Sequence, residues 1–162
     1  MFFLTSEYMK SGNFKWLLNF FIPIYIACTG TSSGFSGSAN EYAKWRSIYS
    51  KCVYLSGNLE INHFDPFNSD KDKDAELDKF DFSFLDDIKE ITGYIIIYKN
   101  RIKNLNLKSL QIVRGINLFE NKYSIYIDSN ARLERLNFVN LTGKYLLNSH
   151  TIYDIRYLVI YF

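Results

Sequence analysis

Apolar and polar residues alternate along several short segments in the second half of the chain, and two pairs of these segments match. YIIIYKN from Tyr94 matches SIYIDSN from Ser124 at an offset of 30 residues, and RIKNLNLKSL from Arg101 matches RLERLNFVNL from Arg132 at an offset of 31. The one extra residue, Ala131, falls in a turn, where an insertion costs little. Alternation predicts short strands. The fixed period predicts a solenoid whose neighbouring units share one core.

Each unit should turn three apolar residues inward while the intervening Asn and Lys residues face water. These residues are Leu105, Leu107 and Leu110 in the first copy, and Leu136, Phe138 and Leu141 in the second. Asn100 and Asn130 close their strands, where Asn tolerates the left-handed backbone of a sharp turn. VYLSGNLEI, from Val53, is a weaker earlier copy. The alternative is a chance match of two unrelated amphipathic strands. However, a matching strand segment precedes each of the two leucine-rich segments.

The N-terminal segment has the pattern of an export signal. The apolar run WLLNFFIPIYI, which ends at Ile26, follows Lys10 and Lys15. Its length suits the apolar region of a signal peptide and falls short of the ~20 residues that span a bilayer. We expect residues 1–27 to be a signal peptide cleaved after Ala27. The alternative is a buried N-terminal strand or helix.

A short helix is predicted after residue 38. Ser38 followed by Glu41 is a capping-box pattern. Tyr42, Trp45 and Tyr49 then recur on one helical face.

Two cysteines flank this helix. In an exported chain Cys28 and Cys52 lie in an oxidising compartment and can form a disulfide, which would hold the helix against the strand that starts at Val53. In the alternative, Cys28 is lost with the signal peptide and Cys52 is buried and unpaired. Cleavage after Ala27 keeps both cysteines.

Composition and motifs reduce the number of possible function classes. Aromatic residues make up 18% of the chain, which favours β structure. A net charge of +2 gives no electrostatic case for nucleic acid or an anionic membrane. Two Cys and two His are too few for a Cys-rich zinc site. The sequence has no P-loop, G-x-G-x-x-G or nucleophile elbow, so we expect neither an enzyme nor a cofactor.

An acidic stretch resembles a calcium loop in spacing only. Asp70, Asp72 and Asp74 alternate as calcium ligands would, but Ala75 stands where the loop needs Gly and Asp81 where it needs a bidentate Glu. We therefore predict no metal site and expect a solvated stretch.

One N-x-[ST] sequon is present, at Asn140-Leu141-Thr142. In an exported protein Asn140 is a candidate glycan site. Because Leu141 belongs to the inward ladder, the Asn140 side chain should point outward.

Several strings together resemble a known family. They are C-x-G-T-S at Cys28, GNLEI from Gly57, FSFLDDIKEITGYIII from Phe82, NLKSLQIVRG from Asn106 and FENKYSIYIDSN from Phe119. Residues 28–144 resemble the first L domain of epidermal growth factor receptors, with the insulin-receptor family more distant. The resemblance implies a mainly β fold, a right-handed parallel β-helix similar to a leucine-rich-repeat solenoid, with a disulfide-linked N-terminal capping helix. Residues 145–162 form a divergent C-terminal tail.

The insertion between Ile61 and Asp81 is longer than the connection in the family. The part from Asn62 to Lys79 is polar and lies outside the repeat, so we predict that it is dispensable for folding.

The resemblance also implies a function. We expect an extracellular growth-factor-binding domain, or a truncated ectodomain fragment, of an epidermal-growth-factor-receptor-like tyrosine kinase. Its partners would be an EGF-like peptide growth factor and a second receptor in a homo- or heterodimer. Kinase activity and membrane attachment would belong to a missing C-terminal part of the parent receptor. The alternative is a secreted stand-alone L-domain protein that acts as a decoy or adhesion partner.

The ligand contacts of the family can be carried over to positions of this chain. They fall on Phe35, Gly37, His63, Lys99, Glu120, Asp128 and Ser129. Near Phe35 the resemblance implies a strand segment that pairs with the growth factor by β-addition. His63, Lys99 and Asp128 depart from the family, where a Tyr and two apolar residues stand. The alternative is that all these positions are solvated residues of a module with another partner.

Overall fold

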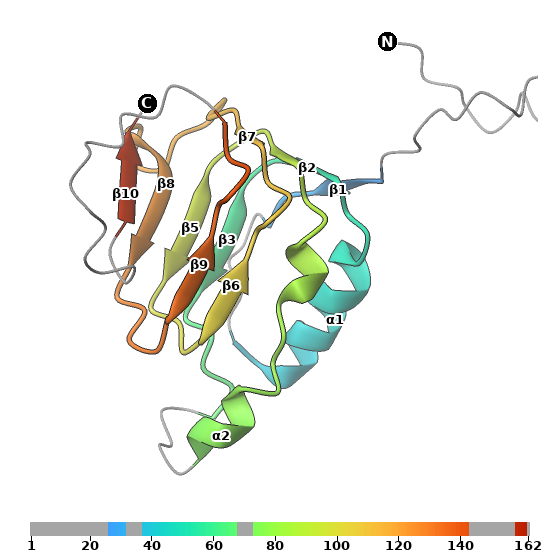
Figure 1. Cartoon of the computed structure of the whole chain (residues 1–162), viewed down its shortest axis with the longest axis vertical. Coiled ribbons are helices and arrows are strands. Elements are labelled where there is room, and N and C mark those ends of the chain that lie inside the picture. The colour runs from blue at the N-terminus through green and yellow to red at the C-terminus, as the bar shows by residue number, and fades with distance from the viewer. Residues whose placement is uncertain (1–25, 32–36, 68–72, 143–157, 162) are drawn as a thin grey trace, which may run out of the picture.

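The computed structural model describes residues 26–31, 37–67, 73–142 and 158–161 (Figure 1). Its strands are β1 (Ala27–Thr29), β2 (Tyr54–Ser56), β3 (Leu59–Asn62), β4 (Glu90–Ile91), β5 (Ile95–Tyr98), β6 (Asn104–Asn106), β7 (Ile112–Val113), β8 (Tyr123–Asp128), β9 (Arg135–Asn137) and β10 (Leu158–Tyr161). Sheet A has the order β1-β2-β4-β7, sheet B the order β10-β8-β5-β3, and sheet C consists of β6 and β9. The prediction of a mainly β domain is confirmed.

The chain passes through the three sheets in a repeating order, and we call each pass a layer. β4, β5 and β6 lie in sheets A, B and C, and β7, β8 and β9 follow in the same order, each parallel to its counterpart. Backbone hydrogen bonds of 2.8–2.9 Å join each layer to the next: Val53 donates to Ile26, Lys89 to Val53, Gln111 to Lys89 and Thr142 to Gln111. The layering therefore reaches at least Thr142.

The strand register confirms the predicted repeat. Ile95 in β5 pairs with Ile125 in β8, and Leu105 in β6 pairs with Leu136 in β9, which are the offsets of 30 and 31 seen in the sequence. The weaker copy also takes its place, because β2 pairs with β4 and β3 with β5.

One apolar core collects side chains from all three sheets. Leu105, Leu107 and Leu110 are fully buried in it, as predicted. The corresponding residues of the second copy are partly buried and pack against it. From the other sheets the core contains Leu55, Leu59, Ile61, Ile91, Ile95, Ile97, Val113, Ile125 and Ile127.

Asn100 and Asn130 are buried, but the predicted reason for them is wrong. The left-handed φ angles fall one residue earlier, at Lys99 (53°) and Ser129 (58°). The Oδ1 atom of Asn130 accepts hydrogen bonds from the backbone N–H of Asn100 (3.0 Å) and from its Nδ2 (3.1 Å), while Asn130 Nδ2 donates to the carbonyl of Ile97 (2.8 Å). These side chains therefore satisfy polar groups between layers.

Helix α1 (Ala39–Tyr49) forms where the sequence predicts it. The Ser38 hydroxyl accepts a hydrogen bond from the N–H of Glu41 at 3.2 Å, which caps the first turn. Tyr42 and Tyr49 are buried, and Trp45 packs against the core.

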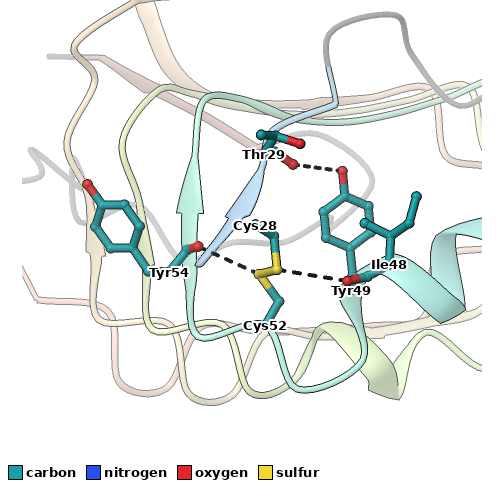
Figure 2. Close-up of a disulfide and its surroundings, with 6 residues drawn as sticks. All are labelled: Cys28, Thr29, Ile48, Tyr49, Cys52 and Tyr54. Atoms are coloured by element: carbon teal, nitrogen blue, oxygen red, sulfur yellow. Dashed lines mark hydrogen bonds between the residues drawn. A yellow bond between two sulfur atoms is a disulfide. The ribbon is translucent and has the colours of Figure 1, made fainter. Parts of the chain in front are cut away.

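A disulfide fastens α1 to the first strand (Figure 2). It joins Cys28 in β1 to Cys52, with their Cα atoms 6.0 Å apart, so the predicted pairing is confirmed. The hydroxyl of Tyr49 also donates to the carbonyl of Thr29 at 3.0 Å. Because β1 is an edge strand of sheet A, these contacts place the helix against the first layer.

The final described strand was not expected from the sequence. β10 pairs with β8 in the antiparallel direction, with Leu158 opposite Ile127 and Ile160 opposite Ile125. It lies at the outer edge of sheet B, within the predicted divergent tail (Figure 1).

The insertion contains helix α2 (Asp74–Leu77), which projects below the strands in Figure 1, and leads to the 3-10 turn η3 (Ser83–Leu85). Leu77 is buried. Asp65, near the start of the insertion, pairs with Arg101 at 3.2 Å, and Asp78, near its end, pairs with Arg132 at 3.1 Å. The expectation of a merely solvated stretch is therefore wrong for Leu77, whereas Asp78 is exposed and forms an ion pair.

Most of the predicted signal peptide lies outside the described residues, and the domain boundaries stay a prediction. β1 begins at Ala27, and the carbonyl of Ile26 accepts the N–H of Val53. Among the helices that the structure describes, none has the length and apolar character needed to cross a bilayer.

Candidate ligand-binding face

Three of the predicted ligand contacts form one row at the end of sheet B. The last residues of β3, β5 and β8 are paired in register, and His63, Lys99 and Ser129 follow them directly. All three have left-handed backbones, with φ of 56°, 53° and 58°. The structure therefore brings together residues that lie far apart in the sequence.

Gly37 lies against the start of this row. A Cβ atom at Gly37 would come within 2.6 Å of the carbonyl oxygen of His63 and 2.8 Å of the N of Asp65. Its φ of +83° also favours glycine. Phe35 lies outside the described residues.

Glu120 lies in the turn that precedes β8. It is exposed and has a φ of 51°, and Phe119 pairs with Tyr123 across the turn. Burial raises the pKa of Tyr126, and the charges of Asp128 and Glu120 add to this effect. The two predicted acidic contacts, Asp128 and Glu120, therefore both raise the pKa of Tyr126.

An aromatic stripe that was not predicted from the sequence crosses the outer face of sheet B. We use this name for Tyr94, Tyr98, Phe119, Tyr123 and Tyr126. Ring centroids are 5.9 Å apart for Tyr94 and Phe119, 5.2 Å for Phe119 and Tyr126, and 6.3 Å for Tyr98 and Tyr126. Tyr123 lies 5.5 Å from Tyr126. All five side chains are half-buried, so part of each ring remains available to a partner.

Carboxylates hold two hydroxyl groups of the stripe. Tyr94 donates to Glu60 at 2.6 Å, and Tyr126 donates to Asp128 at 3.1 Å. Burial, followed by the hydrogen bond to Glu60, raises the pKa of Tyr94 to about 12. Each of these two hydroxyl groups is therefore oriented by a carboxylate.

Two of the departures from the family contact the same tyrosine. The His63 ring meets Tyr98 edge-on with centroids 5.5 Å apart. The Nζ of Lys99 lies 4.9 Å from the centroid of the Tyr98 ring. Tyr98 is therefore the centre of a small polar and aromatic group at the end of β5.

A sequence signal for the stripe was present. Tyr98 and Tyr126 alternate with the buried residues Ile97, Ile125 and Ile127, so the period of two places both rings on the outer face. Their meeting depends on the pairing of β5 with β8, which the repeat had predicted.

The glycan site remains a prediction. Asn140 is exposed, in agreement with the expected outward direction, and its Nδ2 donates to the carbonyl of Lys108 at 2.6 Å. Thr142 donates its hydroxyl to the carbonyl of Gln111 at 3.1 Å. Over the residues that the structure describes, no group of three or more His, Cys, Asp or Glu residues could hold a metal ion.

Comparison with known proteins identifies the family. Residues 51–152 match the family model described as Receptor L domain. The chain is 33% identical over 124 residues to mouse receptor tyrosine-protein kinase erbB-4, which covers 71% of this chain and 9% of the relative. It is 36% identical over 106 residues to mouse receptor tyrosine-protein kinase erbB-2 (64% of this chain, 8% of the relative). The epidermal growth factor receptor of Drosophila melanogaster is 35% identical over 108 residues (62% and 7%).

The chain thus spans less than a tenth of the length of these relatives. The matches confirm the resemblance to epidermal growth factor receptors, and the family model places the matched part in a receptor L domain. Taken with the layered sheets and the disulfide-linked helix, they show that the chain belongs to the receptor L domain family.

Proposed function

We propose that this L domain binds an EGF-like peptide growth factor on the outer face of sheet B, as an extracellular part of a receptor tyrosine kinase. The names of the relatives support the class of receptor. The disulfide supports an oxidising, extracellular location. The parallel layers support a right-handed β-helix as the scaffold. In a full-length parent, the bound growth factor would act through receptor dimerisation.

The aromatic stripe is the observation that carries this proposal. Aromatic side chains dominate the energetics of protein interfaces when they anchor in a buried contact. Here Tyr98 and Tyr126 lie beside His63, Lys99 and Asp128, the positions that the family resemblance selects. The two rings therefore offer aromatic anchors beside the positions where the family has a Tyr and two apolar residues.

The surface is also suited to specificity. Glu120 is exposed at the rim of the stripe, where a carboxylate steers an oppositely charged partner but adds little affinity. Gly37 lies next to His63 and leads from the predicted β-addition segment. A growth factor that covered Gly37 and the stripe would contact sheet B at an edge and on its outer face.

The test is a binding titration with EGF-like growth factors from the same organism. The full chain would be displayed on a cell surface, and Tyr98→Ala and Glu120→Lys would be compared with the parent. We expect Tyr98→Ala to weaken binding about thirtyfold, which corresponds to a hot-spot loss of about 2 kcal/mol. Glu120→Lys should slow association, most strongly at low salt.

Matched controls separate the face from the fold. Tyr54→Ala removes a half-buried tyrosine in sheet A, and Asp87→Lys reverses an exposed charge between η3 and β4. Both controls should bind like the parent. If Tyr98→Ala and Glu120→Lys bound a growth factor with unchanged affinity and rate, the outer face of sheet B would not be the ligand face.

A further inference from the structure

One group on the aromatic stripe has the chemistry of a cation site. Tyr98 and Asp128 are direct neighbours in the register of β5 and β8. The ring of Tyr126 lies beside Tyr98, and its hydroxyl donates to Asp128. Two aromatic rings and one carboxylate therefore meet on the outer face of sheet B. A ring face attracts a cation through its quadrupole, and a carboxylate attracts it by charge.

A cation from the protein already lies on one of these rings. Lys99 is exposed, and its Nζ lies 4.9 Å from the centroid of the Tyr98 ring. Tyr98 raises the pKa of Lys99, chiefly through a hydrogen bond, and Asp128 adds a smaller effect. Lys122 repeats the arrangement 5.1 Å from the ring of Tyr123. The stripe therefore accepts alkylammonium groups on its tyrosine rings.

We propose that Tyr98, Tyr126 and Asp128 form a subsite for a basic side chain of the ligand, and that Lys99 fills this subsite while no ligand is bound. The inference rests on the proposed function, because it names the ligand group that the same face recognises. Arginine is the better occupant, since its planar guanidinium stacks on a ring and pairs with a carboxylate at the same time. Exposure of Lys99 lets its flexible stem swing away when arginine arrives.

The neighbouring charges fit this occupant. Glu60 and Glu120 lie near the stripe in addition to Asp128, as shown by the hydrogen bond of Tyr94 and the effect of Glu120 on the pKa of Tyr126. Once Lys99 moves away, an incoming cation on the Tyr98 ring can pair with the carboxylate of Asp128. An acidic or purely aliphatic ligand group could not form this ion pair.

The experiment is an NMR titration of the full chain with N-acetylarginine amide, followed on the ring resonances of Tyr98 and Tyr126. N-acetylcitrulline amide, which is neutral and nearly the same shape, is the matched probe. We expect the arginine probe to shift both rings and to bind about two- to fivefold more tightly than the citrulline probe. Lys99→Met should strengthen binding of the arginine probe by a similar factor, because the internal competitor is gone.

A second variant should change the affinity for the arginine probe in the opposite direction, and a third should leave it unchanged. Asp128→Asn is nearly isosteric and should weaken the arginine probe about two- to fivefold while leaving the citrulline probe unchanged. Lys44→Met, on the exposed side of α1, removes the same charge elsewhere and should change neither probe. Equal affinity for both probes, or no gain in Lys99→Met, would overturn the subsite. The small probes need no growth factor, so loss of growth-factor binding alone would reject the proposed function and leave this result standing.

Discussion

Single polar side chains close gaps in the backbone hydrogen bonding where the chain turns from one sheet to the next. The hydroxyl of Thr92, between β4 and β5, accepts the N–H of Gly57, between β2 and β3, at 2.8 Å. Asn130 serves the following corner in the same way. At a corner the strands no longer pair, so a buried N–H must find a side chain or water.

Asn130→Ala tests how much such a bridge contributes. The change leaves the N–H of Asn100 and the carbonyl of Ile97 without the partner they have in the parent. An unsatisfied buried polar group costs about 1–3 kcal/mol, so we expect the free energy of unfolding to fall by about 2–3 kcal/mol. Urea denaturation measures this as a lower midpoint at constant slope.

Asn137→Ala is the matched control for this change. Asn137 donates to Asn106 at 2.6 Å, but it is exposed, so water can replace the lost bond. Its cost should stay within about 0.5 kcal/mol, as for most surface substitutions. Equal losses in the two variants would show that the buried bridge of Asn130 carries no special weight.

The sequence could predict positions at this scale better than roles. The inward direction of Leu105 follows from alternation, which depends only on neighbours in the chain. The role of Asn130 depends on a backbone N–H 30 residues away, so turn propensity gave the wrong reason for it. Tyr98 and Tyr126 lie in the two matching segments, but at positions that do not correspond, and their contact forms only after the layers stack.

Among the elements, the repeated strands were predicted, whereas the packing of the insertion was not. Equal spacing in the sequence translates directly into register, so the repeat alone is enough to pair β5 with β8. In the insertion a polar composition hides two buried residues, Phe64 and Leu77, and an ion pair between Asp78 and Arg132. Arg132 comes from the repeat pattern, so the insertion is fastened to the repeat itself. Composition alone does not reveal such a contact.

The insertion should therefore contribute to stability, in contrast to the expectation from sequence. Leu77→Ala should lower the free energy of unfolding by about 2–3 kcal/mol, near the low end for buried leucine, because α2 is short and can adjust. Glu76→Ala, an exposed change in the same helix, should have little effect. Urea denaturation compares both with the parent. A parent-like midpoint for Leu77→Ala would restore the idea of a dispensable loop.

At the scale of the whole molecule, different elements cover the two ends of the layered stack. At the first layer, α1 and the disulfide hold β1. At the last layer, the N–H of Thr142 donates to the carbonyl of Gln111, which precedes β7 of sheet A. In sheet B, β10 pairs with β8 in the antiparallel direction and covers the edge of the sheet. An exposed strand edge is a template for pairing with other chains, so covering it guards against self-association.

Removal of residues 158–162 tests this protection. Backbone N–H groups alternate between the two sides of a strand, so every second amide of β8 faces β10 and the others face β5. After the deletion, the amides that face β10 should exchange with solvent at least tenfold faster, a loss of about 1.4 kcal/mol of protection. The amides that face β5 are the internal control and should keep their rates. Sedimentation should show more self-association at rising concentration, because the free edge of β8 can pair with a second copy. If the alternating pattern of exchange were absent, the edge of β8 would not depend on β10, and the last layer would need another cover.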